Sequence, residues 1–188
     1  MLNENEKFWS LKRIFALPKL DTKKICTIGL LIAVTFVLSY ISGYIRIGNI
    51  SKLSVSFISV FVTAYLFGPV TGGGVAAAAD IISFLVNPTG AFLPQLTLIE
   101  FLYGFLYGVL FYRLSDKTYI LKTVCIAVIQ TLVNMILKTY VLSLFYGPFK
   151  AMFISRIPMC ALQMAIIILG LVLVKPFLAV FKKRVNSR

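Results

Sequence analysis

The chain has 188 residues, of which 60% are hydrophobic and 13% are charged, and its mean hydropathy is +0.94. This composition excludes an ordinary soluble domain and is typical of an integral membrane protein. The formal net charge of +13 does not point to nucleic acid, because basic residues of a polytopic membrane protein first indicate which loops face the cytoplasm.

Residues 1–24 form a basic segment ahead of the first apolar run. Its stretch FWSLKRIFAL mixes aromatic and aliphatic residues with Lys12 and Arg13, a pattern typical of a helix lying on anionic lipid. A disordered basic tail is the alternative. The many charged residues argue against a cleaved signal peptide, so we expect a cytoplasmic amphipathic segment.

Six apolar segments follow, and we expect six transmembrane helices in one compact bundle. A span needs about 20 apolar residues, so the second segment is short and should be tilted, broken or buried by its neighbours. Continuous runs favour helices over barrel strands, which would alternate over about 10 residues. The predicted fold is all-α, with a transmembrane domain over 25–181 and a basic cytoplasmic tail over 182–188. The segments are Ile25–Ile45, Leu53–Phe67, Val70–Val86, Leu96–Tyr112, Tyr119–Phe145 and Phe153–Val174.

The distribution of Lys and Arg predicts the orientation. With the amino terminus inside, the cytoplasmic side holds 14 of the 19 basic residues: six in the amino-terminal tail, three in the fourth connection and five at the carboxyl end. The outer side holds four, and Lys138 lies within a helix. The positive-inside rule therefore predicts that both termini are cytoplasmic.

The usual catalytic and metal-binding residues are scarce. The chain has no histidine, and its three cysteines, Cys26, Cys125 and Cys160, show no disulfide or metal-ligand spacing. The glycine-rich GPVTGGG at 68–74 lacks the Lys-Ser/Thr that a phosphate-binding loop requires. We therefore expect no catalytic residue, no metal and no cofactor.

Ionisable residues inside the spans gather in the predicted outer half of the membrane. A charge at the bilayer centre costs roughly 2.5–3.5 kcal/mol, so Asp80, Glu100, Lys138 and Arg156 each need a reason. They either pair with one another to hold the helices together, or they line a ligand site in which Lys138 and Arg156 bind an anionic group. The basic excess, which includes Lys52 of an outer loop, favours a ligand for the cations.

Helix five adds a polar stripe, because Gln130, Asn134 and Lys138 are spaced by four residues. The inner halves of the helices offer no comparable charge, so the pattern predicts a pocket open only to the outside. Aromatic residues near that end could stack on a planar ligand or form an ordinary interfacial belt. They are Phe92, Tyr140, Phe145, Tyr146 and Phe149.

Small residues let helices approach closely, within the bundle or against another membrane protein. Gly29 and Ala33 form such a pair on the first helix, and Gly104 and Gly108 form one on the fourth. Internal packing is the default interpretation.

Residues 57–108 contain four motifs: an LFGP turn, an Ala-Asp pair, a P-T-G-A-aromatic-x-P loop and a Thr-Leu helix start. These motifs are Leu66–Pro69, Ala79-Asp80, Pro88–Pro94 and Thr97-Leu98. With them, the segment resembles the S components, the substrate-binding subunits, of energy-coupling factor (ECF) vitamin transporters, and specifically the folate family. The six-segment size and the LSLFYG stretch extend the resemblance over nearly the whole chain.

The resemblance implies a subunit in a prokaryotic cell membrane that captures a vitamin, with folate as the expected one, at its outer face. Its partners would be a transmembrane scaffold subunit and two cytosolic ATPases, and Gly29 and Ala33 fall on the family's docking motif. The chain departs from the family at Lys52, at Ser59 and within RIPMCALQ (156–163). The resemblance therefore supports fold and mechanism more strongly than it supports folate.

We expect Lys52, Lys138 and Arg156 to hold ligand carboxylates, and Asn134 and Gln163 to hydrogen-bond the edge of a ring. The other substrate-binding candidates are Phe92, Gln95, Glu100 and Tyr140. An S component for another vitamin or small anionic metabolite is the nearest alternative. A membrane-embedded enzyme using Asp80 and Glu100 as acid and base, or a purely structural scaffold, belongs to a different class.

Overall fold

The structure is a computed structural model, and it describes residues 21–44, 46–47, 51–52, 54–88, 92–112 and 118–186. The predicted amphipathic stretch at 8–17 lies outside these residues. In chain order the elements are α2 (Thr22–Tyr44), β1 (Arg46–Ile47), β2 (Ser51–Lys52), α3 (Phe57–Phe67), α4 (Pro69–Val86), α5 (Pro94–Phe111), α6 (Tyr119–Val133), the π-helical turn η2 (Asn134–Lys138), α7 (Thr139–Tyr146) and α8 (Phe149–Asn186).

The described residues form a helical membrane protein, as the apolar runs predict. Five segments are long and apolar enough to cross a bilayer: Thr22–Ser42, Pro69–Val86, Pro94–Phe111, Tyr119–Phe145 and Phe149–Leu178. Helix α3 is apolar but has 11 residues, a length of about 16 Å, or half the thickness of the hydrocarbon core. Neighbouring helices bury most of it, in line with the prediction for the short second segment.

Two local features differ from the prediction. The short antiparallel pair β1–β2, in which Arg46 faces Lys52, was not predicted, because two-residue strands are too short to show a period. Helix α8 extends past Val174 to Asn186, into the segment predicted as a tail, and contains Pro158 and Pro176. Proline is tolerated inside transmembrane helices.

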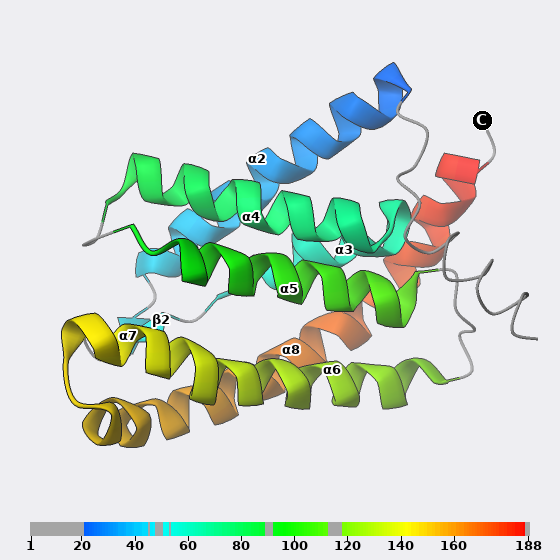
Figure 1. Ribbon diagram of the computed structural model, residues 1–188. Helices are drawn as coiled ribbons and strands as arrows, with labels where there is room; N and C mark the ends of the chain where they lie inside the picture. Colours follow the sequence, from blue (N-terminus) through cyan, green and yellow to red (C-terminus); the bar gives the residue numbers. More distant parts are fainter. Residues whose placement is uncertain are drawn as a thin grey trace, which may run out of the picture.

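Small residues bring α4 and α5 into close contact. A Cβ atom on Gly104 would overlap the backbone of Gly72, and one on Gly108 would overlap the backbone of Pro69. The turn that leads into α4 depends on Gly68, whose φ of 98° lies in a region that side chains disfavour. Helices α2 and α3 pack against this pair, so α2–α5 form one half of the molecule, and α6–α8 form the other (Figure 1).

An apolar seam joins the two halves. The ring of Phe61 contacts Tyr107 and Phe111 at centroid distances of 5.6 and 5.0 Å, and Phe111 contacts Tyr119 at 5.2 Å. The Tyr119 hydroxyl donates to the carbonyl of Leu171 in α8 at 2.6 Å. These buried rings tie α3 and α5 to α6 and α8 near the start of α6.

The opposite end of the molecule gathers α7, the start of α8, the start of α5 and the β1–β2 pair (Figure 1). The charged residues within the helices lie toward this end: Glu100 is near the start of α5, Lys138 directly precedes α7, and Arg156 is near the start of α8. The fold thus separates an apolar seam from a polar end.

Candidate functional site

An ion pair links the two halves at the polar end. Lys138 Nζ lies 2.7 Å from Glu100 Oε1, and the two side chains are 25% and 32% exposed. Lys138 belongs to the π-helical turn and Glu100 to the second turn of α5. Of the alternatives open from sequence, the structure thus shows a helix–helix pair for Glu100 and Lys138, within a cluster that also holds Arg156.

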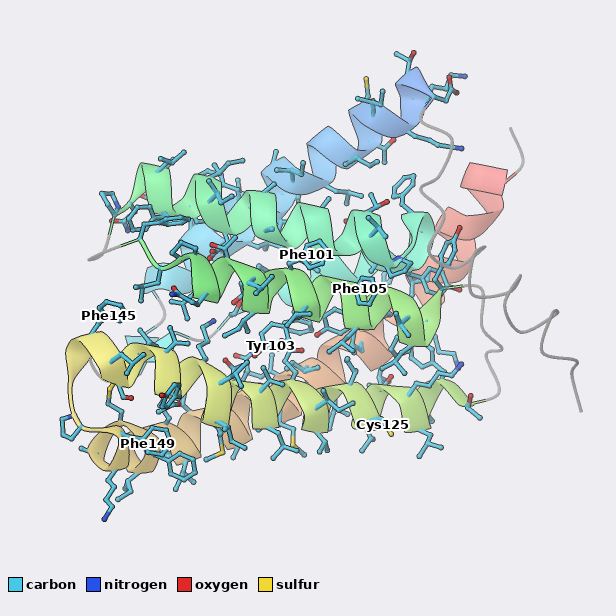
Figure 2. All side chains as sticks on the ribbon, in the orientation of Figure 1. Phe101, Tyr103, Phe105, Cys125, Phe145 and Phe149 are labelled. Atoms are coloured by element: carbon cyan, nitrogen blue, oxygen red, sulfur yellow. The ribbon has the colours of Figure 1, made fainter. Side chains whose placement is uncertain are left out.

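Deeper along α5, two tyrosines bind one glutamine of α6. The Tyr107 hydroxyl donates to Gln130 Oε1 at 2.6 Å, and the Tyr103 hydroxyl contacts the Gln130 carbonyl at 3.5 Å. All three residues are buried. Figure 2 shows Tyr103 between α5 and α6. These bonds supply the partners that buried polar groups require. They lie deeper in the bundle than the pair formed by Glu100 and Lys138.

Arg156 of α8 reaches the same helix as Lys138. Its guanidinium donates from Nη1 to Thr139 Oγ1 at 3.3 Å, and the Thr139 hydroxyl donates to the carbonyl of Asn134 at 3.2 Å. Arg156 is 8% exposed, and Thr139 is fully buried. The chain of bonds ties a buried cation to the π turn on which Lys138 lies.

The π turn keeps the predicted polar stripe in line. Residues four apart in an α-helix overshoot one turn by about 40°, so Asn134 is rotated by that amount from Gln130. A π turn closes i→i+5 hydrogen bonds and holds more than four residues, so the step from Asn134 to Lys138 rotates back. Gln130 and Lys138 therefore face α5 together, where they meet Tyr107 and Glu100.

Asp80 lies apart from these bonds and has a packing contact. The Thr97 hydroxyl of α5 donates to Asp80 Oδ2 of α4 at 2.7 Å. The Ala-Asp and Thr-Leu motifs thus meet across the α4–α5 contact.

Gln163, which was expected to bind the ligand, and Ser59, where the chain departs from the family, make contacts within the protein. Gln163 Nε2 donates to the carbonyl of Ser54 at 2.9 Å, and its Oε1 accepts from the Ser54 N–H at 3.1 Å. Ser59 is buried and its hydroxyl contacts Thr35 Oγ1 at 2.9 Å and the Leu31 carbonyl at 3.2 Å. The departure from the family at Ser59 therefore lies between α2 and α3.

The aromatic candidates are spread around the polar end. Phe92 packs on Phe84 at a centroid distance of 5.0 Å and is 43% exposed. Tyr140 is 59% exposed and shares an outward stripe of the α6–α7 span with Ile136 and Leu144. Phe145 and Phe149 lie at the α7–α8 turn (Figure 2) and are exposed, as an interfacial belt would be.

The remaining candidates lie at the edges of the polar end or on another face. Gln95 is exposed in the first turn of α5, and Lys52 is the last residue of β2. Gly29 and Ala33 are exposed on α2, and no described residue lies within 4 Å of a Cβ built on Gly29. Both small residues therefore lie on a face of α2 that the described part of the chain leaves exposed.

The structure thus brings together Glu100, Asn134, Lys138 and Arg156 and places Gln163 farther along α8. Sequence reasoning missed Tyr103, Tyr107 and Thr139. A signal for the tyrosines was present, since Glu100, Tyr103 and Tyr107 are spaced by three and four residues and share one helix face. Thr139 gave none, because a threonine within an apolar run is common in membrane helices.

Comparison with known proteins identifies a family and relatives with similar sequences. The profile of the family described as "ECF transporter, substrate-specific component" matches residues 23–175. A protein of Clostridium novyi (strain NT) named folate transporter FolT is 35% identical over 111 residues, an alignment that covers 57% of this chain and 63% of that relative. A second protein of that name, from Streptococcus mutans serotype c (strain ATCC 700610 / UA159), is 29% identical over 149 residues, covering 76% and 80% of the two chains.

Two solved structures resemble the fold over most of its length. A crystal structure of FolT bound with folic acid matches with a TM-score of 0.72 and 28% identity, covering 81% of this chain and 92% of that one. A structure of the S component of a bacterial ECF transporter matches with a TM-score of 0.68 and 26% identity, covering 86% and 98%. Because the family profile spans most of the helical region that carries the polar cluster, the chain belongs to the substrate-specific components of ECF transporters.

Proposed function

We propose that this protein is the substrate-binding subunit of an ECF-type importer for folate. The observation that carries the proposal is the polar cluster on α5, η2 and α8, which places two cations and one carboxylate inside candidate membrane spans. Charges there are expensive and mark substrate sites. Folic acid is the ligand of the structural relative that shares this fold.

Within this proposal, Lys138 and Arg156 hold the carboxylates of the glutamate tail, with Lys52 approaching from the β1–β2 pair. Asn134, the first residue of the π turn that ends at Lys138, hydrogen-bonds the polar edge of the pterin ring, and Phe92 supplies an aromatic surface at the rim. Tyr140 is left out of the site, because it shares the exposed stripe of Ile136 and Leu144. Gln95 stays at the rim.

The site opens to the outside of the bacterial cell membrane. Both termini lie in the cytoplasm, as the bias of basic residues favours, and α3 with the connection before it makes the sixth crossing. In this orientation the end with α7 and the β1–β2 pair faces outward, where the vitamin is captured.

Partner subunits supply the energy. A transmembrane scaffold subunit docks on α2 through Gly29 and Ala33, and two cytosolic ATPases drive transport. The support is the weak cover of α2, whose span is 11% buried, against 33% for α4 and for α5. A helix presenting small residues and so little covered by its own chain suits contact with another membrane helix.

Equilibrium binding of folate to the purified protein in detergent tests the proposal. Lys138→Met should weaken binding at least 10-fold, because it removes a cation from the site. Lys122→Met is the matched control, since Lys122 lies about 24 Å away along the same α6–α7 span, and it should bind like the wild type. A panel of other vitamins runs in parallel.

The outcomes separate the candidate functions. If a different vitamin binds and folate does not, the protein is still an S component, but folate is not its substrate. Silence across the panel would contradict a vitamin-binding role altogether.

A further inference from the structure

One side chain holds the connection between α2 and α3 against α8. The Gln163 amide donates to the carbonyl of Ser54 at 2.9 Å and accepts from the N–H of the same residue at 3.1 Å. Serving both backbone groups of one residue reproduces the paired hydrogen bonds that an antiparallel strand neighbour would make. The contact joins residues 109 positions apart in the chain, so it sets tertiary geometry.

The position of Ser54 explains why such a clamp is needed. Ser54 lies between β2 and α3, outside both elements, so neither a ladder nor a helix provides its partners. Ser54 is half-buried, and a backbone donor and acceptor that are shielded from water are costly without partners. The adjacent Val55 N–H donates to Ser42 Oγ of α2 at 3.0 Å. The connection is thus anchored on two helices.

The clamp lies on the helix face that carries the site. Gln163 and Arg156 are seven residues apart on α8, which is nearly two full turns, so they share one face about 10 Å apart. Ser54 follows Lys52, the end of β2, by two residues. Figure 1 shows β2 at the same end as α7. Holding Ser54 therefore fixes where the β1–β2 pair lies relative to the polar cluster.

We propose that Gln163 is a positioning residue that holds Ser54, and with it β2 and the start of α3, beside the ligand site, and that it does not bind the ligand itself. The inference deepens the proposed function and rests on it for its effect on folate. Without the clamp Ser54 moves away from α8 more often, and bound folate escapes faster.

Hydrogen exchange followed by mass spectrometry on the full-length, ligand-free protein in detergent tests the clamp. Gln163→Met keeps the length of the side chain and removes both hydrogen bonds, so peptides covering 46–56 should exchange at least 10-fold faster. Leu162→Ala, an exposed neighbour on α8, is the control and should exchange like the wild type. Gln163→Glu keeps the acceptor for the Ser54 N–H but loses the donor. Its exchange rate should therefore lie between those of the wild type and Gln163→Met.

The dissociation rate of folate is the second readout, and we expect it to rise at least 5-fold in Gln163→Met. Unchanged exchange in the ligand-free variant together with weaker folate binding would overturn the proposal and make Gln163 a ligand contact. Faster exchange with an unchanged dissociation rate would overturn the link to the site. If the wild type does not bind folate, the proposed function fails, while the exchange data still decide the clamp.

Discussion

At the scale of single residues, the charges around Lys138 should influence how tightly the candidate site binds an anion. Glu100 lies 2.7 Å from the ammonium, so any ligand carboxylate that approaches Lys138 also approaches a negative charge. Both side chains are partly exposed, which weakens the repulsion through solvent screening. If Lys138 holds a ligand carboxylate as proposed, Glu100 competes with that carboxylate for the ammonium group.

Glu100→Gln should strengthen folate binding about 5-fold. Two charges roughly 6 Å apart interact by about 2–3 kcal/mol at an effective dielectric of 20, and partial exposure reduces this to about 1 kcal/mol. Binding titrations at low and high salt check it, since screening should shrink the gain. A pterin lacking the glutamate tail should bind both proteins equally. Weaker folate binding by the variant would instead show that Glu100 contacts the ligand.

At the scale of elements, the α4–α5 pair depends on glycine for its closeness. Backbone atoms of Gly72 and Gly73 occupy the space that a Cβ on Gly104 would need, and backbone cannot move aside without moving a helix. On the other face of α4, nothing lies within 4 Å of a Cβ built on Gly74. The same substitution should therefore have opposite effects at the two glycines.

Gly104→Ala should lower the thermal unfolding midpoint in detergent, because overpacking of about 1–3 kcal/mol exceeds the gain in helix propensity. Gly74→Ala should raise the midpoint slightly, since it gains up to about 1 kcal/mol of propensity with no clash. Midpoints that move in the same direction in both variants would contradict the close contact of α4 and α5.

At the scale of the whole molecule, two different kinds of contact join the two halves. The apolar seam of Phe61, Phe111 and Tyr119 joins them at one end, and the polar cluster bridges them at the other. The exposed face of α2 lies away from both. In the proposed function, ligand binding and subunit docking therefore use separate surfaces, and we expect a change on α2 to leave the ligand site intact.

Gly29→Leu combined with Ala33→Leu should abolish co-purification with the scaffold and ATPase subunits while leaving folate affinity within about 2-fold. The added side chains fill the surface on which a partner helix would pack. Ala165→Leu, an exposed small residue on α8, is the control and should keep the complex intact. A double variant that still assembles would move the docking surface elsewhere.

Much of the architecture was predictable, because the bilayer requires long apolar helices and permits few charges. The runs at 70–86 and 96–112 match α4 and α5 within two residues at each end. The β1–β2 pair and the π turn were not predictable, since each covers a handful of residues and leaves no period. For the β1–β2 pair the sequence offered one local signal, Gly48-Asn49, a dipeptide typical of hairpin turns.

The sequence by itself determined the class of protein, the approximate positions of its helices and the end of the bundle at which the polar residues gather. It also indicated the family to which the chain belongs. Only the tertiary structure decided the partners: Glu100 with Lys138, Thr97 with Asp80, and Gln163 with the backbone of Ser54. Helix formation depends on nearby residues, whereas a partner depends on how helices rotate against one another. A rotation of one residue, about 100°, replaces every neighbour of a side chain, and close packing across the whole bundle sets that rotation.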